Sequence, residues 1–484
     1  MIAQPSSSTS TAHEAQPRGA HRVREGQRIN HAEAAERFLQ APAHLAFHDH
    51  RLWELRQKRD AEMQQIDEWE ELRALASAIK EHTLGRLDEY LEQFEAAALA
   101  NGAQVHWAAD AAEHNRVVQG ILQDHGARQL IKSKSMLTEE CGLRDHLKAA
   151  GIEVIETDLG ERIQQLDNED PSHVVVPAVH KLRTDVARVF AEHLGSDPEN
   201  ADPHYLAECQ REATRPLILE ADAGMTGANY AIAETGGFVV CTNEGNADLS
   251  ANVPGLHIAS IGIEKLIPRT EHLGVFVRLL SRSALGSPIT QYTSHFRAPR
   301  QGGELHIVLV DNGRSARLGM EAFWPSLKCI RCGACMNTCP VYRRSGGLSY
   351  GATYSGPIGL VLDPTFDRHK YSNLPFASTM NGSCANVCPV KINLHEQIFN
   401  WRKVLARENE LGTGKNLAMA SAGQILSSPA LFRATLATLS LAIKHLPHFA
   451  LYNRLNAWGQ GRDIPESPPY SFYQWYQRNR GEQP

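Results

Sequence analysis

The chain has 484 residues, of which 42% are hydrophobic, and a formal net charge of −6. This length corresponds to about three domains of roughly 150 residues, and the composition supplies a large core, which excludes global disorder, collagen and a coiled coil. The acidic balance argues against a general nucleic-acid binder, because such proteins carry a basic excess that neutralises phosphates.

The N-terminal segment, residues 1–45, is polar, and we expect a disordered tail with a short helical stretch near HAEAAERFLQ. It lacks the apolar stretch of roughly 7–15 residues that marks a secretory signal. No apolar run approaches the ~18 residues that cross a bilayer, and the richest one, Leu431 to Leu446, is interrupted by three basic residues. We therefore predict a cytoplasmic protein without a transmembrane segment, and peripheral membrane contact stays open.

Residues 46–315 are predicted to form a helical lead-in followed by an α/β domain. Leucines at helical spacing indicate helices over residues 51–100 with a solvated charged face. Beyond them, short apolar runs alternate with helical stretches, which is typical of βαβ units around a mostly parallel sheet. The predicted strands are Gln129–Ile131, Ile152–Ile155, Val174–Val176, Leu217–Leu219, Phe238–Cys241, His257–Ile261 and Leu305–Val310. The turn signature Asp311-Asn312-Gly313 ends the domain.

Two further regions follow, a cysteine-rich one over residues 316–400 and a helical one over residues 401–484. Six of the nine cysteines lie between positions 329 and 388. In a reducing compartment such a cluster indicates metal or redox chemistry and not a disulfide framework. The C-terminal region ends in an aromatic tail with Tyr470, Phe472, Tyr473, Trp475 and Tyr476, which we expect to cover an apolar groove on this chain or on a partner.

The first cysteine motif has the spacing C-x2-C-x2-C-x3-C-P, with Cys329, Cys332, Cys335 and Cys339. Thiolates at two-residue intervals let one short loop surround an iron–sulfur cube, and Gly333 lets its backbone approach the sulfur atoms. The alternative is a four-cysteine zinc site, which normally uses two separated C-x2-C pairs. The motif therefore predicts a 4Fe-4S cluster.

The second cysteine motif is less complete, with Cys384 and Cys388-Pro389. In two-cluster ferredoxins the cysteine before proline binds the other cluster. This rule assigns the first cluster to Cys329, Cys332, Cys335 and Cys388. For a second cluster it leaves Cys339 and Cys384, while Asn381 and Ser378 stand where further thiolates are expected. The second site is a cluster with oxygen ligands, a labile cluster, or absent.

Three stretches of the sequence, besides the aromatic tail, are distinctive. The first is EADAGMTGANYAIAETGG, which starts at Glu220, with TNEGN, which starts at Thr242. The second is DNGR, which starts at Asp311, and the third is the cysteine run with YSGPIG, which starts at Tyr354. In these stretches the chain resembles the lactate utilization protein B family over roughly residues 50–480. The family usually has three cysteines in the second motif, and Asn381 stands at the first of them.

This resemblance implies an iron–sulfur electron-transfer subunit of a multi-protein, L-lactate dehydrogenase-type system that oxidises L-lactate to pyruvate. The partners would be its other subunits. The resemblance also implies that the α/β part is a LUD-type domain similar to the sugar-phosphate isomerase and CoA-transferase fold, followed by a ferredoxin-type domain.

The loop from Gly224 to Gly237 is rich in Gly, Thr and Asn, but it is neither a dinucleotide fingerprint nor a P-loop. Tight turns explain it, and otherwise Glu234 and Thr235 are the candidate residues of a small-molecule pocket. The alternative function is accordingly an isomerase or acyl transferase that uses the α/β domain, with a structural or regulatory cluster. We expect a structural role for His257, a buried core thiol at Cys241, and no chemistry at Cys141 and Cys209.

Overall fold

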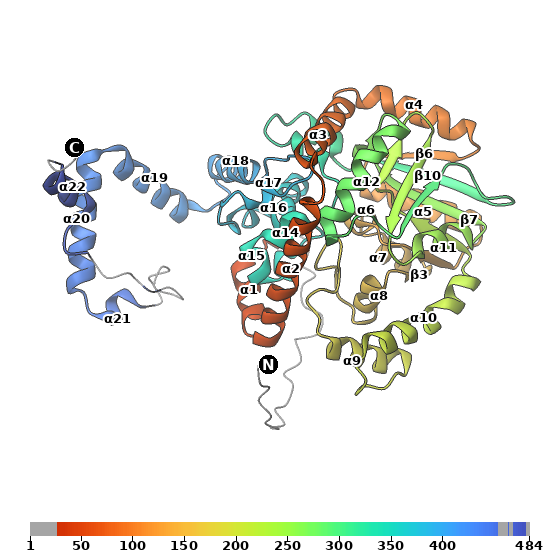
Figure 1. The fold of residues 1–484 in the computed structure, drawn as a ribbon, viewed down its shortest axis with the longest axis horizontal. Helices are drawn as coiled ribbons and strands as arrows, with labels where there is room; N and C mark the ends of the chain where they lie inside the picture. Colours follow the sequence, from red (N-terminus) through yellow and green to blue (C-terminus); the bar gives the residue numbers. More distant parts are fainter. Residues whose placement is uncertain (1–26, 454–462, 464–467, 481–484) are drawn as a thin grey trace. The chain divides into compact units, whose positions relative to one another are not determined.

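The structure, a computed structural model, describes residues 27–453, 463 and 468–480. The chain divides into two compact units, Met1–Leu405 and Ala406–Pro484 (Figure 1). The first unit contains both the α/β domain and the cysteine-rich region. Within the predicted N-terminal tail, the structure has the helix α1 (His31–Leu39) and the start of α2 (Pro42–Met63), while residues 1–26 lie outside the described part.

A six-stranded sheet forms the centre of the α/β domain, in the order β1-β10-β7-β4-β2-β3, and each neighbouring pair is parallel. Its strands are β1 (Gln104–Ala108), β2 (Gln129–Lys132), β3 (Glu153–Glu156), β4 (Ala223–Thr226), β7 (Leu256–Gly262) and β10 (Glu304–Val310). The central strands β4 and β7 are buried throughout, which is why they lack an alternating polar face. The predicted α/β fold with a mostly parallel sheet is confirmed.

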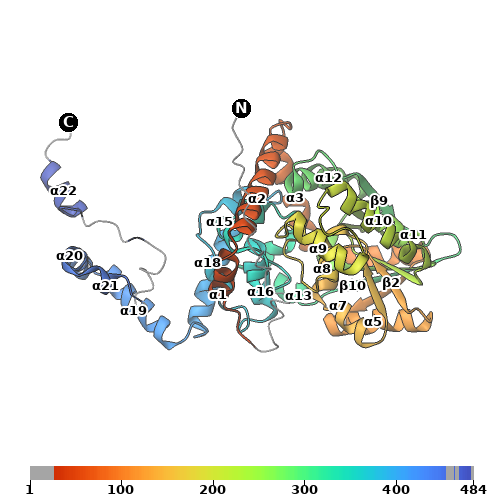
Figure 2. The ribbon, with the colours of Figure 1, turned by 90° about the horizontal axis from the view of Figure 1, so that it is seen from below.

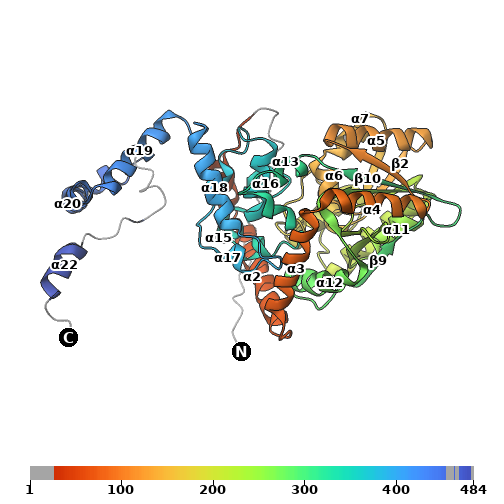
Figure 3. The ribbon, with the colours of Figure 1, turned by 90° about the horizontal axis from the view of Figure 1, so that it is seen from above.

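Helices pack on one face of the sheet and a second sheet lies toward the other. Helices α5 (Ala111–Asp124), α6 (Met136–Glu140) and α7 (Leu143–Ala149) share an apolar core with alternate strand residues, and Figures 2 and 3 show α5 and α7 on the same side. The opposite face packs against α4 (Leu87–Ala100), α11 (Asn246–Asn252) and the second sheet, ordered β8-β5-β6-β9. The strands of that sheet are β5 (Tyr230–Ile232), β6 (Gly237–Thr242), β8 (Leu266–Ile267) and β9 (Tyr292–Phe296).

The N-terminal helices share a core with the cysteine-rich region. Helix α2 packs on α14 (Ala334–Thr338), on α15 (Pro340–Ser345) and also on α12 (Thr270–Leu285), while α3 (Trp69–Leu84) packs on the 3-10 helix η2 (Trp324–Lys328). The remaining helices of the cysteine-rich region are α16 (Gly356–Phe366), α17 (Ser383–Asn386) and α18 (Leu394–Arg407) (Figure 1). Leu52 of α2 and Trp401 of α18 belong to one buried cluster. The lead-in is thus part of the packing around both regions of the first unit.

The predicted strand Leu217–Leu219 is wrong, because these residues lie in helix α10 (Pro203–Glu220). The side chain of Asp202 begins this helix by accepting hydrogen bonds from two backbone N–H groups, each at 3.0 Å. Only Ile218 of the apolar run is buried, against Ile131 and Ile155 of the sheet. An apolar run of three residues does not distinguish a strand from one face of a helix.

The predicted strand Val174–Val176 is also wrong, since it is a loop between α8 (Leu159–Leu166) and α9 (Arg183–Leu194). The backbone N–H groups of Val175 and Val176 donate to Nδ1 of His173 at 3.0 and 3.1 Å, and not to a neighbouring strand. The buried side-chain ring therefore replaces a sheet ladder as the hydrogen-bond partner.

The second unit is helical, as predicted, with α19 (Thr413–Ser427), α20 (Pro429–His445), α21 (His448–Leu451) and α22 (Phe472–Asn479). Among the described residues no one helix has both the length and the apolar character to cross a membrane. By these two criteria α19 and α20 pass only as a pair, with a bend of 110° between them. Neither of these two helices buries a residue, and the aromatic side chains of the tail are exposed.

A buried ion-pair network joins the α/β domain to the cysteine-rich region. Arg314, only 2% exposed, donates to Glu140 at 2.8 Å and to Glu264 at 2.5 Å, and the Tyr354 hydroxyl donates to Glu140 at 2.5 Å. Burial raises the pKa of both carboxyls, but the charge and hydrogen bonds of Arg314, together with smaller contributions from neighbouring groups, hold the pKa of each below its ordinary value. The DNGR stretch thus ends in the residue that ties these segments together.

Replacing Arg314 with Met leaves both carboxylates buried without their cation, and we expect a loss of about 3–5 kcal/mol of stability at pH 7. In the wild type the lowered pKa values stabilise the fold above the ordinary value near 4.5, and this contribution is lost as the pH falls. In the variant the pKa values rise, so the deficit relative to wild type should shrink between pH 7 and pH 5. Denaturant unfolding at both pH values measures this, with the exposed Arg116→Met as control; an equal deficit at both would contradict it.

Candidate metal centre and adjoining cavity

The structure gathers the six cysteines of the two motifs where α14 packs on α2 and α17. Five of them are 7–9% exposed and Cys329 is partly buried, and all six are free thiols. Short helices separated by tight loops produce this arrangement. Gly333, the N-cap residue before α14, has a φ of +73°. A side chain there would place its Cβ 2.8 Å from Cε1 of the buried His173, so the position requires glycine.

The thiols of the first motif act on one another and on those of the second motif. Burial raises the pKa of Cys335 most, and the charges of Cys332, Cys329, Cys384 and Cys388 raise it further, in that order. For Cys332, burial is again the largest cause and the charge of Cys388 comes next. Although Cys388 belongs to the second motif, it therefore lies in the same electrostatic neighbourhood as the first three cysteines. When iron binds these thiol groups it displaces their protons, because the thiolate is the form that binds a metal.

The charge of Cys339 acts on Cys384. After burial, the charge of Cys339 contributes most to the raised pKa of Cys384. Asn381 is exposed, and its Oδ1 accepts a hydrogen bond at 3.1 Å from the backbone N–H two residues further along, as Ser378 Oγ does. Both side chains therefore serve the turns of their own loop, and this second pair has two thiols to offer a metal.

The cysteine sulfurs have backbone hydrogen-bond donors. N–H groups donate at 3.4 Å to the sulfurs of Cys329 and Cys388 and at 3.5 Å to Cys339. Such bonds stabilise negative charge on sulfur, which is the charge that cluster ligands carry. Soft sulfur donors, burial and N–H groups aimed at sulfur together fit an iron–sulfur cluster at Cys329, Cys332, Cys335 and Cys388.

Two buried arginines hold the backbone of the second motif. Arg73 of α3 donates from Nε and Nη2 to the carbonyl of Cys388, at 3.0 and 2.8 Å, and from Nη2 to that of Asn386 at 2.7 Å. Arg59 of α2 donates to the Val387 carbonyl at 3.1 Å. The sequence does not predict the role of these two arginines. Their helices carry many charged residues that we expected to face solvent, and no pattern distinguishes these two positions from the others.

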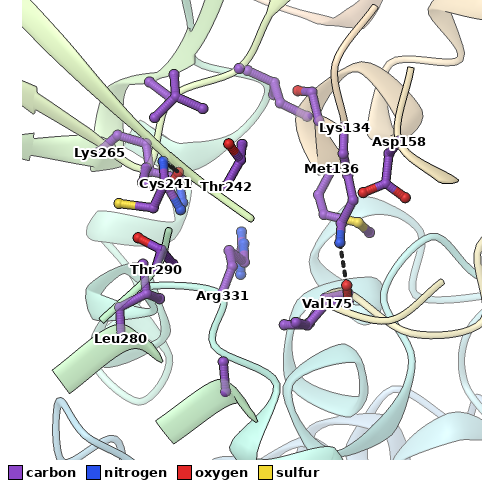
Figure 4. A pocket seen from close by; sticks show the side chains of 18 of the residues that line it. Lys134, Met136, Asp158, Val175, Cys241, Thr242, Lys265, Leu280, Thr290 and Arg331 are labelled. Atoms are coloured by element: carbon purple, nitrogen blue, oxygen red, sulfur yellow. Dashed lines mark hydrogen bonds between the residues drawn. The ribbon is translucent and has the colours of Figure 1, made fainter. Parts of the chain in front are cut away.

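A cavity of about 250 Å³ adjoins the first cysteine motif. From the α/β domain it is lined by residues 227–229 after β4 and by Glu264 and Lys265 after β7, and from the cysteine-rich region by Arg331 and Tyr354. Figure 4 shows the Arg331 side chain rising from the cysteine loop into this space. The carboxyl ends of the parallel strands and the cluster loop thus form one site.

Basic groups lie at the boundary between the cavity and the cysteine loop. Arg331, which stands between Cys329 and Cys332, stacks on the Tyr354 ring at 4.5 Å, and its Nη2 lies 3.7 Å from Glu264. Lys265 faces the same region; burial lowers its pKa to about 8, although the charge of Glu264 acts in the opposite direction. The positive charges make this part of the cavity suited to an anion.

The predicted pocket residues lie elsewhere. The exposed Glu234 accepts hydrogen bonds from the backbone N–H and the hydroxyl of Thr270 at 3.1 and 3.2 Å, at the start of α12. The hydroxyl of Thr235 accepts from the N–H of Gly237 at 3.2 Å. Neither residue lines the cavity beside the cysteine loop, to which the same glycine-rich stretch contributes residues 227–229. Glu234 lines a separate cavity, together with His82 and Arg269.

The remaining candidates have local roles in the structure. His257 and Thr226 are hydrogen-bonded at 2.9 Å, both buried, which agrees with a structural histidine. Cys241 is partly buried and lines the cavity, so it is not a core thiol, and burial raises its pKa to about 11. Cys141 is buried between helices α6 and α7, and Cys209 lies in α10.

The substitution Arg73→Lys keeps the positive charge, but a lysine ammonium lacks the planar guanidinium that donates to two carbonyls at once. We expect it to cost about 1–3 kcal/mol of stability and to lower the iron bound per chain, because the loop that carries Cys388 loses its anchor. Thermal unfolding and iron analysis after identical anaerobic purification measure both effects. Arg51→Lys, at an exposed ion pair on α2, is the matched control; equal iron retention in both variants would contradict the anchoring role.

Comparison with known families matches residues 91–315 to the LUD domain and residues 325–392 to the 4Fe-4S dicluster domain. A crystal structure of a DUF162 family protein from Deinococcus radiodurans matches with a TM-score of 0.25 and 16% identity, over 46% of this chain and 98% of that one.

Curated relatives match along most of the chain. Lactate utilization protein B of Geobacillus kaustophilus is 42% identical over 439 residues, 87% of this chain and 91% of that protein. The protein of the same name from Macrococcus caseolyticus is 40% identical over 87% of this chain and 91% of its own. An uncharacterized electron transport protein of Escherichia coli is 39% identical over 88% of this chain and 91% of its own. The chain therefore belongs to the lactate utilization protein B family, with a LUD domain followed by an iron–sulfur domain.

Proposed function

We propose that this protein is the iron–sulfur electron-transfer subunit of a multi-protein system that oxidises L-lactate to pyruvate. The observation that carries the proposal is the electrostatic grouping of cysteines from two distant motifs, with backbone N–H groups directed at their sulfurs. The names of the relatives, which refer to lactate utilization and to electron transport, supply the pathway.

The residues that would hold a 4Fe-4S cluster are Cys329, Cys332, Cys335 and Cys388. Such a cluster, when bound, accepts and releases single electrons. The chain supplies the surroundings: burial excludes water, and the guanidinium groups of Arg59 and Arg73 place positive charge beside the second motif, which favours the more negative reduced state. These residues would tune the reduction potential as well as hold the loop.

The second site is proposed to be incomplete. Cys339 and Cys384 provide two thiolates, and Asn381 provides an amide that the structure shows bonded to its own loop. Two thiolates do not complete a four-iron site. We infer one well-held cluster per chain, and we infer that the second site lacks the thiolates expected at positions 381 and 378.

The partners are inferred from electron counting. Oxidation of lactate to pyruvate removes two electrons, and the sequence has neither a dinucleotide fingerprint nor a P-loop. Other subunits of the system would therefore perform the two-electron step and exchange electrons with this chain. The reduced cysteines suit a reducing compartment, and we place the protein in the cytoplasm on that ground.

Anaerobically purified protein, reduced with dithionite, is expected to give the EPR signal of a reduced 4Fe-4S cluster, with about four iron and four sulfide per chain. Cys335→Ser should abolish the signal because it removes one of the four proposed cluster thiolates. Cys209→Ser, in helix α10, should retain it. A colourless or zinc-filled preparation would overturn the proposed function.

Asn381→Cys is expected to raise the iron content from about four to about seven or eight atoms per chain, because it adds the missing thiolate three residues before Cys384. The control Asn386→Cys adds an exposed thiol to α17, the short helix that contains Cys384, and should leave the iron content unchanged. Iron and acid-labile sulfide are measured on all three proteins. A wild type that already holds about eight iron atoms would show that the asparagine does not limit the second site.

A further inference from the structure

The cavity beside the cysteine loop lies where ligands bind in open α/β sheets, outside the carboxyl ends of the strands. Residues 227–229 follow β4, Lys134 and Ser135 follow β2, and all of these line it. The loop of the first cysteine motif contributes Arg331 to the wall. A ligand in this cavity would touch the α/β domain and the proposed cluster loop together.

Several polar atoms that border the cavity are buried without a hydrogen-bond partner in the described part of the chain. They are Arg331 Nη1, Thr242 Oγ1, Asn246 Oδ1 and Ser281 Oγ. The residues Asn246 and Ser281 are 4% and 2% exposed. Buried polar groups are nearly always satisfied in native proteins, so donors and acceptors gathered around one cavity point to a polar ligand.

The charged residues that line the cavity are the basic Lys134, Lys265, Arg314 and Arg331 and the acidic Asp158, Glu244 and Glu264. Figure 4 shows Lys134 and Asp158 on one side and Lys265 on the other, with Arg331 between them. Glu264, near Lys265, is already bound by Arg314 through a hydrogen bond of 2.5 Å. Nη2 of Arg331 lies 3.7 Å from Glu264, so the groups offered to an anion are Lys265 and Nη1 of Arg331, which has no hydrogen-bond partner among the described residues. A guanidinium matches a planar carboxylate.

The size and the walls limit the ligand to a short carbon chain. Met136, Val175 and Leu280 add apolar surface to the lining. At about 250 Å³ the cavity lies below the usual range of roughly 300–1,000 Å³ for ligand pockets. These features favour a small organic acid over a nucleotide or a cofactor.

We propose that this cavity binds a short 2-oxo or 2-hydroxy carboxylate, with its carboxylate on Arg331 and Lys265 and its second oxygen on neighbouring polar groups such as Thr242. The choice of acid rests on the proposed function, because lactate and pyruvate belong to this class. The inference goes further by assigning the acid a site on this subunit. Since Arg331 stands between two of the proposed cluster ligands, the bound anion would change the charge beside the cluster.

The test uses full-length, cluster-loaded protein under anaerobic conditions. Calorimetric titration compares pyruvate and L-lactate with propionate, which lacks the second oxygen, and with inorganic phosphate. We expect about one pyruvate or lactate per chain, and weaker binding of propionate and phosphate. We also expect pyruvate or lactate to shift the EPR signal of the reduced cluster.

Two variants probe the two ends of the acid. Lys265→Met should weaken binding at least tenfold, and Thr242→Val, which keeps the shape but removes the hydroxyl, should weaken it about three- to tenfold. Lys148→Met, at an exposed position of α7, is the control and should bind like the wild type. Iron content and the EPR signal without added acid should be the same in all four proteins, which separates ligand binding from cluster assembly.

The inference is overturned if cluster-loaded protein binds neither acid, if phosphate or propionate binds as tightly, or if Lys265→Met and Thr242→Val bind like the wild type. In each of these cases an intact EPR signal leaves the proposed electron-transfer role standing. Protein that never acquires a cluster contradicts the proposed function instead, so the two failures are distinguishable.

Discussion

The position of Cys388 depends on two buried arginines that come from the opposite end of the chain. Three thiols of the first motif are close together because of their spacing, but the fourth arrives on a separate loop. Arg73 and Arg59 bind three consecutive carbonyls of that loop, those of residues 386–388. Both guanidinium groups are buried, and burial makes an unmatched charge costly. The loop therefore has a defined place only when helices α2 and α3 are packed.

Buried ion pairs and a hydrogen bond also join the cysteine-rich region to the α/β domain. Arg314 follows the last strand of the sheet and binds carboxylates from α6 and from the segment after β7, one of which also accepts from Tyr354. The carboxyl edge of the sheet is thus connected by ion pairs and hydrogen bonds to the region that holds the cysteines. The cavity lies at this junction, with Arg331 of the cysteine loop in its wall.

This arrangement gives the LUD domain a role in an electron-transfer subunit. The domain supplies a cavity with basic groups and unpartnered polar atoms, and the cysteine-rich region supplies the sulfur ligands next to it. If the proposed acid site and the cluster site are both occupied, the charge of the acid and the charge of the cluster influence each other through Arg331. The proximity follows from the fold, because the carboxyl ends of parallel strands lie at one edge of the sheet.

The sequence by itself determined the α/β class, five of the ten described strands (β2, β3, β6, β7 and β10) and the cysteine motifs, because these depend on local periodicity and on spacing along the chain. It failed at Leu217–Leu219 and Val174–Val176, where an N-cap residue and a buried histidine ring took the place of a sheet ladder. It selected Glu234 and Thr235 as candidate pocket residues, and only tertiary structure shows that they lie away from the cavity at the cysteine loop, which residues 227–229, Lys265 and Arg331 surround. Burial and long-range charge pairing decide such positions, and neither is encoded in a local pattern.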